Sequence, residues 1–155
     1  MSPGDDSTLS HFDESLEVVG AVPTLIVALD CEQPLRPSLR LSVAGVSQVD
    51  LGRGRERSSS RASGVLVVRL ADRWMSTAHA RLTHDGSSWI LHDLGSKNGT
   101  LVNGERCERL ELTPGDVIEV GHTILLFAVA ALHRQAEPDV EAHQLRPRLP
   151  EHAQS

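Results

Sequence analysis

Three short segments of the chain combine hydrogen-bond donors and positive charge with almost no acid. They are Gly52-Arg53-Gly54-Arg55, Met75-Ser76-Thr77-Ala78-His79 and Gly95-Ser96-Lys97-Asn98-Gly99-Thr100. Guanidinium, hydroxyl, ammonium and carboxamide groups together suit a phosphate dianion, which accepts several charge-assisted hydrogen bonds. The chemistry that these residues predict is therefore the binding of an anion.

The distribution of charge also favours an anionic ligand. Between residues 51 and 81, seven arginines stand against the two acids Glu56 and Asp72, a local charge of +5 in a chain whose net charge is −6. A confined cationic region on an acidic protein indicates a focused anionic ligand more than a long polyanion. Aromatic residues make up only 3% of the chain, so a stacking surface for nucleic acid is not expected.

Catalytic, cofactor and metal patterns are incomplete. Ser76 and His79 could serve as nucleophile and base, but no nucleophile elbow or matching acid accompanies them. Segment 52–54 lacks the third glycine of a dinucleotide fingerprint, and segment 95–100 lacks the ending of a phosphate-binding P-loop. The 8 histidines are scattered without metal-ligand spacing. We therefore expect no enzyme, no cofactor and no metal.

Short strands and frequent turns must position the three segments. Turn signals such as Asp85-Gly86, Asn103-Gly104 and Pro114-Gly115 separate short β-branched or alternating runs. No segment has a helical period longer than two turns. This pattern therefore predicts an all-β, antiparallel sandwich of about eleven short strands. Loops at one end of such a sandwich can converge. The predicted strands are 24–29, 39–43, 46–51, 65–70, 78–83, 88–91, 100–102, 109–112, 117–120 and 123–129.

Composition divides the chain into three parts. Residues 1–20 hold five acids and no Lys or Arg, which predicts a flexible acidic arm and is the reverse of a signal peptide. Residues 21–131 are expected to be the folded domain, and the proline-containing residues 132–155 a disordered tail. The longest apolar run, 124–132, is too short to span a bilayer. We expect a cytoplasmic protein with no membrane partner.

In their order and spacing, these motifs resemble the forkhead-associated (FHA) domain family over about residues 22–130. The resemblance implies an FHA/SMAD-like sandwich that binds phosphothreonine-containing protein segments. The start TLIVALDCEQPL and the LGRGR junction are similar to FHA regions of bacterial AAA+ enhancer-binding activators, although no ATPase or DNA-binding segment is recognised. The motifs are Gly52-Arg53, Ser76-x-x-His79, Ser96-x-Asn98-Gly99-Thr100, Val102-Asn103-Gly104, Leu112-x-Pro114-Gly115-Asp116-x-Ile118 and Gly121.

The resemblance implies a role for each binding residue. Arg53 would grip the phosphate with its planar fork, and the Ser76 hydroxyl with the neighbouring amide of Thr77 would bind phosphate oxygens. Lys97 would contact phosphate or peptide backbone, and Asn98 would hydrogen-bond the main chain of the ligand. The residues expected to support the site are Gly52, His79, Gly99 and Asn103, with His79 bracing the loops from behind.

Thr77 departs from the family pattern. Many members have a basic residue directly after the loop serine, so one phosphate cation is missing, and Arg55 or Arg73 are candidate replacements. Thr77 therefore keeps open an alternative function, a phosphate-independent protein-interaction module. Arg57 and Arg61, on either side of three serines, are predicted to lie in a solvated loop.

The resulting prediction is a phosphothreonine-peptide adaptor in bacterial Ser/Thr kinase signalling or transcriptional regulation. Its partner would be a protein that a kinase has phosphorylated on threonine. Phosphoserine should bind less well, because the family pocket accommodates the threonine methyl group. The acidic arm carries Thr8, which could be phosphorylated and captured by the chain's own domain.

Overall fold

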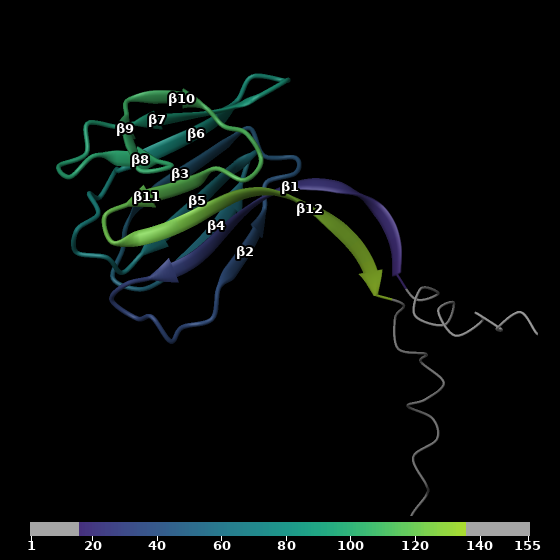
Figure 1. The fold of residues 1–155 in the computed structure, drawn as a ribbon, viewed down its shortest axis with the longest axis horizontal. Helices are drawn as coiled ribbons and strands as arrows, with labels where there is room; N and C mark the ends of the chain where they lie inside the picture. The colour runs from purple at the N-terminus through teal and green to yellow at the C-terminus, as the bar shows by residue number, and fades with distance from the viewer. Residues whose placement is uncertain (1–15, 136–155) are drawn as a thin grey trace, which may run out of the picture. The chain divides into compact units, whose positions relative to one another are not determined.

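The computed structural model describes residues 16–135, which form twelve β-strands in two sheets and no helix (Figure 1). Accordingly, this part of the chain has no helix able to cross a membrane. Residues Ala21–Ala130 form one compact unit. The strands are β1 (Leu16–Asp30), β2 (Leu39–Ser42), β3 (Gln48–Arg53), β4 (Ser58–Ala62), β5 (Val65–Leu70), β6 (Ala80–His84), β7 (Trp89–Asp93), β8 (Thr100–Val102), β9 (Glu105–Cys107), β10 (Arg109–Glu111), β11 (Val117–Val120) and β12 (Thr123–Gln135).

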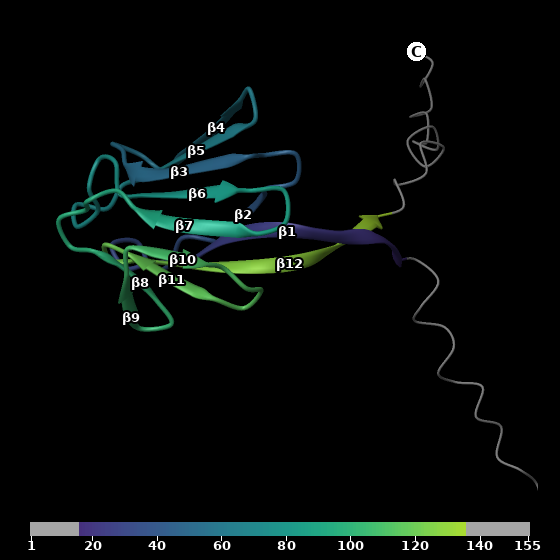
Figure 2. The same cartoon turned by 90° about the horizontal axis from the view of Figure 1, so that it is seen from above.

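Alternation of apolar residues explains which face of each strand lies inside. In β5, Leu66, Val68 and Leu70 are buried, whereas the residues between them face outward, as the two-residue period of a strand requires. Figure 2 shows the sheets as two layers. The core between them consists mostly of Leu, Val and Ile side chains. Burial of this apolar surface holds the layers together.

The strand order brings distant segments together. One sheet has the order β2-β1-β12-β11-β8-β9 and the other has the order β10-β7-β6-β3-β5-β4. All pairs with a determined register are antiparallel except β3 and β5, which are parallel. The all-β sandwich prediction is confirmed, with one parallel pair. That pair arises because β4 folds back on β5, which takes the place beside β3.

Three details differ from the sequence-based expectation. Ser58–Ala62 is a strand rather than a solvated loop, and Glu105–Cys107 adds another. β1 begins at Leu16 and β12 ends at Gln135, so the strands extend past the boundaries 21–131. The rest of the predicted arm and tail, including Thr8, lies outside the described residues.

Candidate anion-binding site

The end of β3 presents Arg53 to the neighbouring loop. The Arg53 amide donates to the carbonyl oxygen of Ser76 at 3.0 Å, and Arg53 Nη2 donates to Thr77 Oγ1 at 3.4 Å. The close approach depends on Gly52, because a Cβ there would overlap the Thr77 carbonyl oxygen. The arginine side chain remains exposed and available to a ligand.

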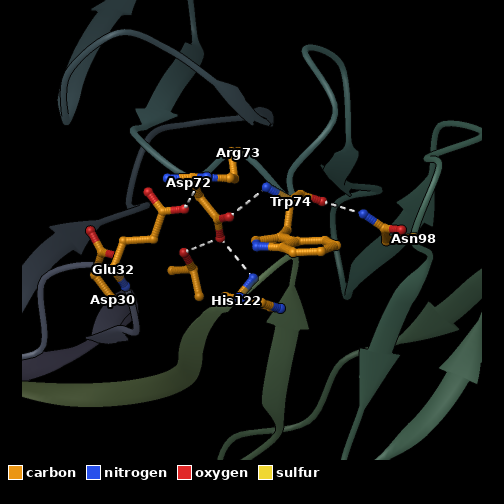
Figure 3. A network of polar contacts seen from close by, with 8 residues as sticks. Asp30, Glu32, Asp72, Arg73, Trp74, Asn98 and His122 are labelled. Atoms are coloured by element: carbon orange, nitrogen blue, oxygen red, sulfur yellow. Dashed lines mark hydrogen bonds and ion pairs between the residues drawn. The ribbon is translucent and has the colours of Figure 1, made fainter.

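A buried carboxylate organises the loop between β5 and β6. Asp72 is only 1% exposed. Its Oδ1 accepts the Trp74 amide at 2.9 Å, while Oδ2 accepts the His122 amide at 2.7 Å and Thr123 Oγ1 at 2.8 Å. Three donors satisfy a group that would otherwise be expensive to bury. Asp72 therefore ties the β5–β6 loop to the turn between β11 and β12 (Figure 3).

Trp74 lies at the rim of this loop (Figure 3). Its indole stacks on His122 with 4.7 Å between ring centroids and 24° between the planes, yet 47% of the residue is exposed. Its carbonyl oxygen accepts Asn98 Nδ2 at 2.8 Å, which fixes the Asn98 side chain. Beside it, Arg73 Nε forms an ion pair with Glu32 Oε1 at 3.2 Å.

His79 connects the loops from inside. The residue is fully buried. Its Nδ1 accepts the Ser76 amide at 3.0 Å, and its Nε2 lies 2.9 Å from the Gly99 carbonyl oxygen. Since Nδ1 accepts, the neighbours assign the neutral tautomer in which Nε2 donates to that carbonyl. This is the position that a bracing residue requires.

Asp93 shapes the loop between β7 and β8. Its carboxylate accepts the amides of Gly95 and Ser96 and the hydroxyls of Ser96 and Thr100. Burial alone would raise the pKa of Asp93, but the hydrogen bonds from Ser96 and Thr100 lower it below its ordinary value. The loop is thus held in one conformation by a charged acceptor.

The β7–β8 loop also contacts the β5–β6 loop, which carries Ser76, directly. The Lys97 amide donates to Ser76 Oγ at 3.0 Å. The Ser76 hydroxyl therefore accepts one hydrogen bond and keeps its own hydrogen for a ligand. Gly99 has a φ of 82°, a left-handed conformation that favours glycine.

The three loops enclose one open depression. It is lined by all five residues that the sequence singles out for binding, namely Arg53, Ser76, Thr77, Lys97 and Asn98, together with Arg73, Trp74 and Met75. Three of the eight are cations and none is an acid. Of the two candidate replacements for the missing cation, Arg73 lines this depression and Arg55 does not. The arrangement can bind an anion through charge and several directed donors.

Two groups of predicted residues lie elsewhere. Asn103 lies at the opposite end of β8, where its side chain donates to Asp116 and accepts the Val117 amide. It ties the turn after β8 to the start of β11 and does not line the depression. Arg57 lies in the loop between β3 and β4, as predicted, whereas Arg61 lies on β4. Their guanidinium groups donate to backbone carbonyls of residues 37, 42 and 44.

Sequence reasoning did not identify Asp72, Asp93 or Arg69 as parts of the site. Asp72 is one of only two acids in the arginine-rich region, a signal that could have marked it. Asp93 lies two residues before Gly95, at the start of the loop between β7 and β8, where a side-chain acceptor for loop amides is common. Nothing in the sequence indicates that Arg69 donates to the Thr77 carbonyl oxygen, at 2.9 Å.

Two facing sheets with donor-rich loops gathered at one end define a β-sandwich binding module. Residues 49–121 match the family model of the FHA domain, so the protein contains an FHA domain. The mouse protein "Angiogenic factor with G patch and FHA domains 1" is 28% identical over 137 residues, which cover 83% of this chain and 18% of that protein. FhaA of Mycobacterium tuberculosis, an FHA domain-containing protein, is 34% identical over 85 residues, which cover 51% of this chain and 16% of FhaA.

Solved structures show the same fold. The FHA domain of an Arabidopsis thaliana hypothetical protein has a TM-score of 0.55 at 26% identity, covering 77% of this chain and 93% of that one. A structure from work on phosphothreonine-dependent FHA domain interactions has a TM-score of 0.50 at 28% identity, covering 70% and 99%. The chain spans only 16% to 24% of the length of three curated relatives that it matches.

Proposed function

We propose that this protein binds protein segments containing phosphothreonine at the depression between its three loops. The observation that carries the proposal is the convergence of Arg53, Ser76 and Lys97, with their charge and hydroxyl donors, on a surface that no acid lines. The FHA domain match and the similarity to a structure from work on phosphothreonine-dependent interactions support it.

The geometry divides the work of binding among the loops. Arg53 extends from β3 with a planar fork suited to two phosphate oxygens. The Ser76 hydroxyl acts as the acceptor in its bond with the Lys97 amide. Its own hydrogen is therefore free to be donated to a third phosphate oxygen. Asn98 is held by the Trp74 carbonyl oxygen, which leaves its own amide oxygen for a main-chain donor of the ligand.

The proposed biological role is that of an adaptor without catalytic activity. Phosphorylation of a partner adds about −1.5 to −2 charges and several acceptor oxygens, so a Ser/Thr kinase would create the ligand. A bacterial signalling role and a cytoplasmic location, where such kinases act, belong to the proposal. The acidic arm as an internal ligand and the disordered tail remain predictions.

The competing function is phosphate-independent protein interaction, and Thr77 is the observation in its favour. A pool of peptides with a fixed phosphothreonine and random flanking residues distinguishes the two. The protein should retain a subset of the pool, and phosphatase treatment of the pool should abolish retention. Equal retention before and after phosphatase treatment would contradict the proposed function and favour the alternative.

A further inference from the structure

Arg69 reaches the site from outside the three loops. It lies on β5, and in the register of the sheet it stands beside Gly52 of β3 and opposite Ser58 of β4. Its side chain belongs to the outward face of the strand. From there Arg69 Nη1 donates to the carbonyl oxygen of Thr77 at 2.9 Å.

Two glycines leave the space that this side chain occupies. A Cβ at Gly52 would overlap both the Arg69 guanidinium and the Thr77 carbonyl oxygen, and a Cβ at Gly54 would lie 2.7 Å from the Arg69 Cβ. Any larger residue at either position would displace the arginine or the loop. Gly52 and Gly54 thus form a passage across the outer face of the sheet for the Arg69 side chain.

Thr77 is consequently bound by two arginines. Arg69 donates to its carbonyl oxygen, and Arg53 donates to its hydroxyl. Within residues 16–135 the ion pairs are those of Arg73 and Arg81, so neither guanidinium at Thr77 is neutralised by a described carboxylate. The two positively charged guanidinium groups that contact Thr77 repel each other. An anion bound beside Thr77 relieves that repulsion.

We propose that Arg69 is a positioning residue of the anion site that replaces the cation missing after the loop serine. It fixes the Thr77 backbone, and through the Thr77 hydroxyl it orients Arg53, while its charge raises the local positive potential. The inference rests on the proposed function where it concerns a phosphothreonine peptide. Where it concerns the binding of phosphate itself, it is independent of that function. It assigns to Arg69 the compensation for which the sequence offered Arg55 or Arg73.

The test compares Arg69→Gln, Arg69→Lys and the control Arg109→Gln. The control removes the same charge from β10, an edge strand separated from β5 by three other strands of the sheet. Two probes are used: a phosphothreonine peptide selected from the random pool by the parent protein, and inorganic phosphate followed through the NMR amide signals of Ser76 and Thr77. Binding is measured at low and at high salt, and the melting temperature of each variant is recorded.

We expect Arg69→Gln to raise the Kd for both probes about five- to tenfold, an effect of the size of one ordinary hydrogen bond, and to flatten the salt dependence. Arg69→Lys keeps the charge and should stay within about twofold of the parent, because a lysine also offers a cationic donor. Arg109→Gln should match the parent. Parent-like binding by Arg69→Gln would overturn the inference. So would equal losses in the Gln and Lys variants with lowered melting temperatures, since these indicate a purely structural role.

The two probes separate this inference from the proposed function. If the parent retains phosphorylated and dephosphorylated peptides equally, the proposed function fails. The phosphate titration then still decides the role of Arg69, because it needs no peptide. A phosphate-induced shift of the Ser76 and Thr77 amides that Arg69→Gln weakens would support the inference, and absence of any shift in the parent would overturn it.

Discussion

Replacing His79 with alanine tests whether one buried ring holds the loops together. The ring accepts the Ser76 amide and donates to the Gly99 carbonyl oxygen, at a residue with no exposed surface. Losing two hydrogen bonds costs about 2 kcal/mol, and the cavity left by the imidazole adds to this. We expect His79→Ala to lower the free energy of unfolding by about 2–4 kcal/mol. For a domain of this size the melting temperature falls by about 8–16 °C.

The matched variant is Ser76→Ala, which should behave differently. Among the described residues its hydroxyl accepts only the Lys97 amide, in an exposed contact, so removing it should change the free energy of unfolding by less than about 1 kcal/mol. Both variants should weaken phosphopeptide binding, one through loss of loop positions and the other through loss of a ligand contact. Calorimetric unfolding and titration with the selected phosphopeptide separate the two effects. Indistinguishable variants in both assays would refute the distinction between brace and ligand contact.

Three further predictions concern a ligand contact, a close approach and a buried carboxylate. Arg53→Ala should lose roughly 1.5–3 kcal/mol of phosphopeptide binding free energy, measured by titration, with little change in melting temperature; unchanged affinity would contradict its role. Gly52→Ala should lower the free energy of unfolding by about 1–3 kcal/mol in urea denaturation, because its methyl group meets the Thr77 carbonyl oxygen. Asp93 has a lowered pKa, so its contribution to stability is complete above the ordinary value of 3.8 and is lost as the pH falls through the lower folded value. When the pH falls below 3.8, the free energy of unfolding of Asp93→Asn should therefore decrease less than that of the parent. An acid-unfolding profile parallel to that of the parent would contradict this.

The sequence alone predicted most strands and five of the residues that line the depression. Apolar alternation in Val65–Leu70 and the Asn-Gly turn at residues 98–99 are local signals, because side-chain period and left-handed turns depend on neighbouring residues. The predicted ends of the flanking strands place Arg53, Ser76 and Lys97 in or beside loops. Their convergence was expected from the sandwich fold, and the structure places them around one depression.

The tertiary structure alone decided how the loops are held. Ser58–Ala62 has no buried residue and thus no alternation to reveal it as a strand. It exists because β5 offers it an edge. Asp72 and Thr123 are 51 residues apart, and Asn103, which the sequence grouped with the site, lies at the far end of its strand. Arg69 reaches Thr77 only because Gly52, in a parallel neighbouring strand, leaves room for its side chain. Such contacts depend on which strands become neighbours, and that is set by packing the whole core rather than by any local pattern.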